Sequence, residues 1–451
     1  MPAVRICIIG GGSAYMTSMF ASLARYAQQG TLAGSDVVLT DVNEPAVKLM
    51  YEWGQTGARN EDIPLNFSYT MDLDEALDGA DFVLSCIRPG GLEGRYLDET
   101  IPEKYRELGI ETVGVGGVFM ALRCIPVVVQ IAEAIQRRCP KAWLINYTNP
   151  TNMVVDATLR AGHDRTLGLC DGVWGVKWLA AKLLKLPTLR AGEIDAYTAG
   201  VNHHTWCLKL YHEGRDLYEI MDELIDAVDL SRSSSYENID GDPVVNTVEA
   251  DACRLYRYYG ILPGSVYYAR YYYNLRKLMD HHLQANFEHR STWLQKLGAE
   301  KREGIRRQLA SGAASIAPHD EEDAAHGDQA IGALNAMANN TGMLETANVV
   351  NHGAVPNLPD DAVVEVGCLL GSNGAMPVAA GPLPFSVEGM VRDAYAFGKL
   401  TVDAAISGDR KLVLQAAMAH PAHRDLDVIE KVIDELFEAH RAHLPQFYPN
   451  G

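Results

Sequence analysis

The sequence predicts an α/β fold in which a Rossmann-type, doubly wound parallel sheet is followed by an α+β region. Over residues 1–190, short apolar runs alternate with helical patterns, which is typical of a parallel sheet covered by helices on both faces. A glycine-rich turn joins the first apolar run to the first helical pattern. Beyond about residue 190 the runs lengthen and alternate with polar residues. We therefore expect two domains, at 1–190 and 191–451.

The first domain is expected to contain a sheet of about six strands, because each apolar run is short and is followed by a turn or a helical pattern. Five of these strands can be located directly. The expected strands are 4–10, 36–41, 80–88, 142–150 and 165–170, and the helices between them include 16–28, 44–55 and 151–162.

The second domain begins with residues 193–214, which read as two longer strands ending in a Glu-Gly turn. Residues 312–345 are small, acidic and polar before a helical stretch, and they suggest a surface loop leading into structure. Residues 387–409 and 425–444 carry apolar residues at helical spacing. These C-terminal helices suggest either internal packing or an oligomer face, and we expect a homodimer or homotetramer.

The composition indicates a small-molecule enzyme rather than a protein of nucleic acids or membranes. Asp and Glu number 58 against 39 Lys and Arg, and the formal net charge is -19, which disfavours anionic partners. No run is expected to supply the roughly 20 apolar residues that a membrane helix needs. The eight cysteines are scattered without paired spacing, so a reducing, cytoplasmic location is expected.

The glycine turn indicates a dinucleotide site. Gly10, Gly11, Gly12 and Ser13 follow the first strand and open the first helix, so their amides are expected to face the pyrophosphate of NAD. Asp41 ends the second strand, where a carboxylate binds the adenosine ribose and disfavours NADP. A plain strand-helix turn, with Asp41 as a helix cap, is the alternative.

Polar side chains follow three later strands, at the edge where doubly wound sheets bind their ligands. Arg88 and Arg95 can bind hydroxyls or an anionic substituent, and Asn149 supplies both a donor and an acceptor. The alternative for each arginine is a solvated charge at the surface. The alternative for the asparagine is a purely structural role in a turn. Cys170 is the last residue of the expected strand 165–170, and Asp171 follows it directly.

Two adjacent histidines stand on the first alternating strand of the second domain, so only one of them can face the cleft. His203 or His204 together with Cys170 would form a two-residue site with open positions on a divalent ion. The alternative is a core histidine and a packed cysteine. Five tyrosines follow at 267, 268, 271, 272 and 273; one could be a base if a nearby cation lowers its pKa, and the others are expected to pack.

These motifs together resemble the family 4 glycoside hydrolases, which depend on NAD and a divalent metal, over nearly the whole chain. The resemblance implies the lactate/malate dehydrogenase-like fold, and oxidation of C3 of the sugar by NAD, loss of the C2 proton, elimination of the aglycone, addition of water and re-reduction. The motifs are "IIGGGS", "RPGGLEGRYLDE", "GVGGVFMALRCIP", "NYTNPTN", "GLCD", "GVNHHTW", the tyrosine cluster and "NHGAVPNLPDDAVVEV".

The resemblance also implies roles for individual residues. Cys170 and His203 match the family's ligands for a divalent metal, typically Mn. Asp171 matches the acid that protonates the departing oxygen in 6-phospho-α-glucosidases. Tyr268 is the best match to the C2 base, with Tyr267 as the near alternative. Asn149 and Arg88 match substrate-contacting positions.

The sequence departs from the phospho-α-glucosidases at two places, which leaves the substrate open. Gly172 and Val173 stand where that group has Met-Pro, and residues 208–220 resemble the branch acting on unphosphorylated glycosides or uronides. Asp171 favours an α-linked hexoside, whereas O6 can carry phosphate, a carboxylate or nothing. The alternatives in other classes are an NAD-dependent dehydrogenase of the lactate/malate type and a sugar-nucleotide sensor without chemistry.

Overall fold

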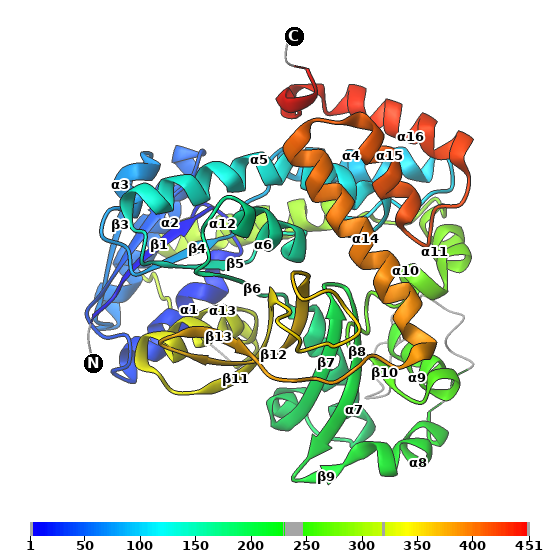
Figure 1. The fold of residues 1–451 in the computed structure, drawn as a ribbon. Coiled ribbons are helices and arrows are strands. Elements are labelled where there is room, and N and C mark those ends of the chain that lie inside the picture. The colour runs from blue at the N-terminus through cyan, green and yellow to red at the C-terminus, as the bar shows by residue number, and fades with distance from the viewer. Residues whose placement is uncertain (1–2, 229, 231–246, 318–320, 449–451) are drawn as a thin grey trace.

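The central sheet confirms the predicted α/β fold. The computed structural model describes residues 3–228, 230, 247–317 and 321–448, and its six parallel strands lie in the order β6-β5-β4-β1-β2-β3 (Figure 1). The strand order reverses between β1 and β4, as in doubly wound sheets. Strand β3 was not located from the sequence, because it is an edge strand whose polar residues alternate with buried ones. The bounds are β1 Arg5–Ile9, β2 Ser35–Thr40, β3 Leu65–Tyr69, β4 Phe82–Ser85, β5 Trp143–Asn146 and β6 Thr166–Gly168.

Helices cover both faces of this sheet because successive strand residues point to opposite sides. On β1, Ile6 and Ile8 pack in one core with α1 and α2, whereas Cys7 and Ile9 pack in another with α3 and α5. The predicted helices at 16–28, 44–55 and 151–162 are confirmed, the second of them extended to residue 60. The helix bounds are α1 Met16–Gln28, α2 Glu44–Asn60, α3 Leu73–Leu77, α4 Gly91–Glu103, α5 Gly114–Arg138 and α6 Thr151–Arg160.

The same sheet continues across the expected boundary at residue 190. Strands β11 (Met343–Val350), β12 (Val363–Gly371) and β13 (Gly374–Pro377) extend it antiparallel from β6, with Asn348 opposite Gly168. Gly168 allows this approach, because a Cβ there would lie 3.2 Å from the Cβ of Asn348 and closer still to two side chains of α6. Strands from the C-terminal half therefore lie beside the strand that leads to Cys170.

A second, smaller sheet confirms the longer strands predicted at 193–214. Strand β8 pairs antiparallel with β7, β9 and β10. The bounds are β7 Ile194–Val201, β8 His204–His212, β9 Arg215–Asp216 and β10 Leu262–Pro263, with helices α7 Trp174–Leu183, α8 Met221–Asp226, α9 Thr247–Tyr259, α10 Arg270–Tyr273, α11 Leu275–His282, α12 Arg290–Ala310, α14 Phe385–Ser407, α15 Arg410–Ala419 and α16 Leu426–Ala439. Helices α14 and α16 confirm the helical spacing at 387–409 and 425–444.

Helix α5 corrects the expectation that no segment is apolar enough to cross a membrane. This 25-residue helix contains an 18-residue window of mean hydropathy 1.9, which meets that condition by length and composition. About 78 % of the window is buried inside the protein, where the helix packs against α4, α6 and α14. Such apolarity all round is typical of a core helix.

Residues 312–345 contain more regular structure than the predicted surface loop. Helix α13 (Glu321–Asn339) packs against α1, and its residues 330–334 are buried. Residues 318–320, in the expected loop, lie outside the described residues. The acidic, alanine-rich composition suggested a loop, but small residues are also typical of helices that pack closely together.

Candidate active site

The first cavity opens at the carboxyl ends of β1, β2 and β4 and has a volume of about 760 Å³. Gly10, Gly12 and Ser13 line it from the turn after β1, Asp41 lines it from the end of β2, and Arg88 from the end of β4. This is the position, at the reversal of strand order, where doubly wound sheets bind nucleotides. The structure thus brings four of the five expected cofactor residues to one cavity, whereas Gly11 is not among the described residues that line it.

The backbone amides of the glycine turn donate hydrogen bonds to other groups of the chain. Gly10 and Gly11 both donate to the last carbonyl of β2, at 2.9 and 3.1 Å, and Ser13 donates to the carbonyl of Gly10. The amide of Gly12 donates to Asp41 Oδ2 at 3.0 Å. This differs from the expectation that all four amides face an anion, because here they and Asp41 hold the turn against β2.

Positive charge at the first cavity comes from outside the turn. Arg302 and Arg306 lie about one helical turn apart on α12, and both line the cavity. Guanidinium groups suit a diphosphate, because they present several donors to its oxygens. The sequence analysis missed both residues, since a basic stretch in a polar helix does not indicate which cavity the helix faces.

The second cavity, of about 700 Å³, lies beyond the end of β6. It is lined by basic, acidic and aromatic side chains from both halves of the chain. Those used below are Arg95, Glu111, Asp171, Trp178, Tyr267, Tyr268, His282, His289, Arg290 and Trp293. Side chains of these kinds are expected to line a site that binds a polar ligand through charge and ring contacts.

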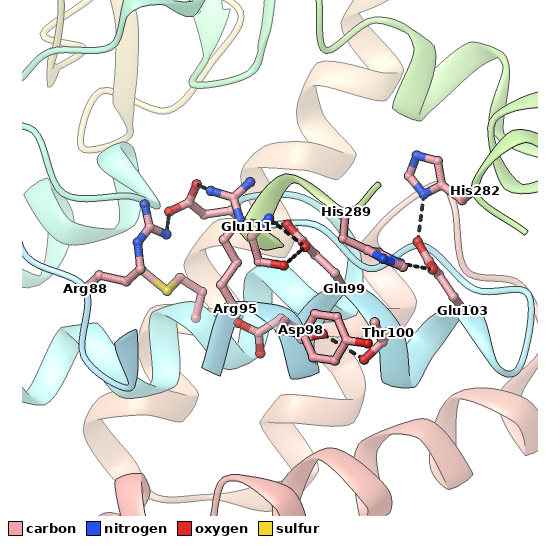
Figure 2. Close-up of polar contacts among 12 residues, drawn as sticks. Arg88, Arg95, Asp98, Glu99, Thr100, Glu103, Glu111, His282 and His289 are labelled. Carbon is pink, nitrogen blue, oxygen red and sulfur yellow. Dashed lines mark hydrogen bonds and ion pairs between the residues drawn. The ribbon is translucent and has the colours of Figure 1, made fainter. Parts of the chain in front are cut away.

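An ion cluster stands between the two cavities (Figure 2). Glu111 accepts hydrogen bonds from Arg88, which lines the first cavity, and from Arg95, which lines the second, the latter at 2.5 Å. Burial favours the neutral carboxyl, but the two arginines lower the pKa of Glu111 to about 2. Both predicted arginines are therefore balanced by a carboxylate that the sequence analysis did not identify.

Carboxylates of α4 tie the start of α12 to the wall of the second cavity (Figure 2). Glu99 bonds both Arg95 and the backbone and hydroxyl of Ser291. Glu103 bonds His282 and His289, each at 2.7 Å. Burial opposes ionisation, but the two imidazoles hold the pKa of Glu103 below its usual range. The segment that carries Arg290 is thus fixed over the cavity.

Cys170 and His203 meet at the end of β6. Their Sγ and Nε2 atoms are 3.4 Å apart, and both side chains are buried. Burial lowers the pKa of His203 to about 3, so its imidazole is neutral and can act as a ligand. The two residues lie 33 positions apart in the chain, and the fold brings them together.

The two adjacent histidines do not share a strand, which corrects the expectation that both lie on one strand. His203 lies in the turn between β7 and β8 with φ 65°, a conformation that few residues other than glycine adopt. His204 begins β8, and its ring stacks on that of Tyr272 at 4.0 Å. Neither histidine is among the described residues that line the two cavities, so the expectation that one of them faces the cleft stays a prediction.

Tyr268 stacks on His203, with ring centroids 3.4 Å apart and an angle of 15° between the planes. Tyr267 also lines the cavity, but its hydroxyl bonds Glu249 at 3.4 Å. Burial raises the pKa of Tyr268 well above its usual value, and Cys170 and Asp171 raise it further. The protein groups alone thus act against the lowered pKa that the sequence analysis associated with a nearby cation.

Asp171 and Asn149 occupy different positions relative to the cavities. Asp171 begins a short 3₁₀ helix directly after Cys170 and lines the second cavity. Asn149 follows β5, and its Oδ1 accepts a hydrogen bond from Thr151 at 3.1 Å. Asn149 is not among the described residues that line either cavity, so its expected contact with substrate stays a prediction.

The donor set at Cys170 and His203 fits a divalent ion. A cysteine is a soft ligand in its thiolate form, which it would take on losing its proton to bind a metal, and a neutral imidazole is a borderline ligand. Two protein ligands leave positions open for substrate oxygens. Within the ranges that the structure describes, no group of three or more His, Cys, Asp or Glu side chains is arranged to hold a metal. A site here would therefore depend on the substrate to complete its coordination.

The comparisons with known proteins agree with this geometry. The family model described as "Family 4 glycosyl hydrolase" matches residues 5–186, and the C-terminal domain model of the same family matches residues 198–423. A probable 6-phospho-beta-glucosidase of Bacillus subtilis (strain 168) is 32 % identical, over 99 % of this chain and 98 % of its own. The 6-phospho-beta-glucosidase of Escherichia coli (strain K12) is 31 % identical, over 98 % of this chain and 97 % of its own.

Solved structures show the same fold. The crystal structure of a 6-phospho-alpha-glucosidase from gut microorganisms, in complex with NAD and Mn²⁺, has a TM-score of 0.87 and 26 % identity, covering 99 % of this chain and all of its own. Malate dehydrogenase of Plasmodium falciparum has a TM-score of 0.53 and 14 % identity, which is a likeness of fold alone. The chain belongs to the family 4 glycosyl hydrolases.

Proposed function

We propose that this chain hydrolyses the glycosidic bond of a hexoside by an elimination that requires NAD and a divalent metal, with Mn as the expected ion. The observation that carries the proposal is the contact of Cys170 with His203, whose ring stacks on Tyr268. Tyr268 and Asp171 line the second cavity, and a nucleotide-sized cavity opens at the ends of β1, β2 and β4. Family membership and the relative crystallised with NAD and Mn²⁺ support both cofactors. A dehydrogenase would have no use for the Cys170–His203 pair.

Each residue at the second cavity then has a defined task. Cys170 and His203 would hold the divalent ion. When bound, NAD supplies reversible oxidation at C3, and the ion polarises the oxygens at C2 and C3. Tyr268 takes the proton from C2, the bond between C1 and the glycosidic oxygen breaks, and Asp171 protonates the departing oxygen. Water then adds its oxygen at C1 while a proton returns to C2, and return of the hydride to the C3 ketone would restore oxidised NAD.

We propose a sugar with an anionic group at C6, a 6-phosphate in the first instance, joined by an α-linkage. The relatives that act on 6-phosphorylated glucosides support the phosphate, and Asp171 supports the α-linkage. Arg290 lines the cavity and forms no ion pair with a carboxylate among the described residues. Burial and the nearby Arg95 lower the pKa of Arg290, and an anion would relieve that unfavourable environment.

The proposal is tested by incubating the purified protein with Mn²⁺, NAD and a reductant against nitrophenyl α- and β-glycosides, each with and without 6-phosphate. Release of nitrophenol without net NADH is expected for the glycosidase. Stoichiometric NADH would instead indicate a dehydrogenase, and no reaction across the panel would indicate a sensor.

The 6-phosphate assignment predicts the behaviour of Arg290→Ala. This change is expected to lower kcat/KM for the 6-phosphorylated substrate about 10- to 100-fold, because one charge-assisted contact is lost, and to affect the plain glycoside little. Arg307→Ala, on the exposed face of the same helix, is the matched control. Equal losses on both substrates would contradict the assignment.

The NAD assignment predicts the behaviour of Asp41→Ala. Loss of the carboxylate at the ribose is expected to weaken the binding of NAD about 10-fold and to reduce the preference for NAD over NADP. Titration of the protein with each nucleotide measures both effects. Because Asp41 also accepts from Gly12, Asp41→Asn serves as a second variant that preserves the shape of the turn. Unchanged NAD affinity in both variants would count against the assignment.

We also propose a cytoplasmic location and a homodimeric or homotetrameric state. The location is supported by the eight cysteines, which are all unpaired in the structure and of which seven are buried. Light scattering of the purified protein measures the oligomeric state directly.

A further inference from the structure

A buried polar network connects the Cys170–His203 pair to strand β12, outside the residues that the family resemblance assigns. Glu365 on β12 accepts a hydrogen bond from Asn202 Nδ2 at 2.8 Å and another from Asn348 Nδ2 at 2.9 Å, both through Oε1. The three side chains are 1 %, 4 % and 0 % exposed, in that order. Asn202 Oδ1, Asn348 Oδ1 and Glu365 Oε2 have no hydrogen-bond partner among the described residues. The two bonds to Glu365 Oε1 therefore define the geometry of this network.

Asn202 is the link between this network and the metal-ligand pair. It lies directly before His203 in the hairpin turn between β7 and β8, and its Nδ2 donates to Glu365 Oε1. Cys170 Sγ lies 3.4 Å from His203 Nε2. The Asn202 side chain thus connects Glu365 to the turn that carries His203.

The carboxyl of Glu365 determines the orientation of the Asn202 amide. Burial raises the pKa of Glu365 to about 7, but its Oε1 accepts hydrogen bonds in either protonation state, because the proton can reside on Oε2. An amide rotated by 180° would place its oxygen against Oε1 and lose the bond. The nitrogen of Asn202 is therefore held toward Glu365, and the turn that contains Asn202 is held against β12.

The strand pairing in turn fixes Glu365. Asn348 lies opposite Glu365 on β11 and opposite Gly168 on β6, and its Nδ2 also approaches the Gly168 carbonyl at 3.4 Å. The network therefore runs from the strand that precedes Cys170, across β11, to β12, and returns to the turn of His203. That turn has a positive φ, which persists only where its surroundings hold it.

We propose that Glu365 is a positioning residue for the divalent-metal site: through its hydrogen bond to Asn202, it holds the turn that presents His203 beside Cys170. The proposal rests on the metal dependence proposed above. Groups that orient metal ligands without touching the metal typically contribute 10- to 100-fold in metal affinity.

The test is direct titration of Mn²⁺ into the full-length protein, followed by the electron paramagnetic resonance signal of the free ion. Glu365→Gln is expected to weaken Mn²⁺ binding about 10- to 100-fold, because a glutamine can turn its own nitrogen to Asn202 and reverse that amide. NAD affinity and the thermal midpoint, measured in parallel, are expected to change little. Glu249→Gln, which removes a buried carboxylate paired with Lys182, is the control.

A second variant keeps the test decisive if Glu365→Gln does not fold. Asn202→Leu removes the amide while preserving its approximate shape, and the same loss of Mn²⁺ affinity with retained NAD affinity is expected. Mn²⁺ affinity within about twofold of the unmodified protein in the variant that folds would overturn the positioning role. Absence of Mn²⁺ binding in the unmodified protein would instead overturn the proposed metal dependence.

Discussion

Replacement of Cys170 by serine, or of His203 by alanine, is expected to abolish turnover. The two side chains meet at 3.4 Å, and no group of three or more His, Cys, Asp or Glu side chains among the described residues is arranged to hold a metal, so we expect no third ligand to compensate for either loss. Since residues that merely orient ligands cost 10- to 100-fold, loss of a ligand itself should cost more than about 100-fold in Mn²⁺ affinity. Steady-state rates and Mn²⁺ titrations measure the two effects.

The matched control is His204→Phe, because His204 lies one residue away, stacks on Tyr272 and does not contact Cys170 through any interaction in the structure. It should retain Mn²⁺ affinity. Removal of the metal with a chelator should stop turnover of the unmodified enzyme, and added Mn²⁺ should restore it. Full activity after exhaustive chelation would contradict the metal assignment.

Tyr268→Phe is expected to remove the exchange of the C2 hydrogen with solvent. In the elimination, the C2 proton is lost and later replaced, so turnover in heavy water should place deuterium at C2 of the released sugar. Tyr268 is the better placed tyrosine, because its ring lies on that of His203, whereas Tyr267 bonds Glu249. Loss of a general base typically costs about 10²- to 10⁴-fold in rate.

The measurement is the deuterium content at C2 by mass spectrometry or NMR, with NAD and Mn²⁺ affinities as checks that the site is intact. Tyr267→Phe, a neighbour that lines the same cavity, is the matched control and should keep the exchange. A substrate deuterated at C2 or C3 should also react more slowly if either transfer limits the rate. Product without deuterium from the unmodified enzyme would refute elimination, and full activity of Tyr268→Phe would refute the choice of base.

The sequence alone determined the strand-turn-helix order of the first half. The helix at Met16–Gln28 and the glycine turn before it follow from patterns within about 30 residues. The spacing of apolar residues and the need for a positive φ at Gly10 are both local properties. The family resemblance likewise rested on short motifs. Cys170, His203 and Tyr268 could therefore be named before their proximity was known.

Only the tertiary structure decided which charges meet at the cavities. Glu111 joins Arg88 to Arg95, and Arg302 lines the cavity of the glycine turn from a helix some 290 residues away in the chain. Nothing in the local pattern around Glu111 distinguishes it from a solvated carboxylate. Its role depends on a buried partner, and burial of a charged side chain is set by the packing of several elements.

The same holds for the C-terminal strands and the network behind the metal site. Asn202 and Glu365 are separated by 163 positions, and they meet because β11 and β12 extend the first sheet beside β6. The sequence reveals which residues are apolar enough to be buried in strands, because that pattern repeats along one segment. The choice of neighbouring strand, and of the polar side chains that become partners, is a property of the assembled sheet and is fixed by packing between segments far apart in the chain.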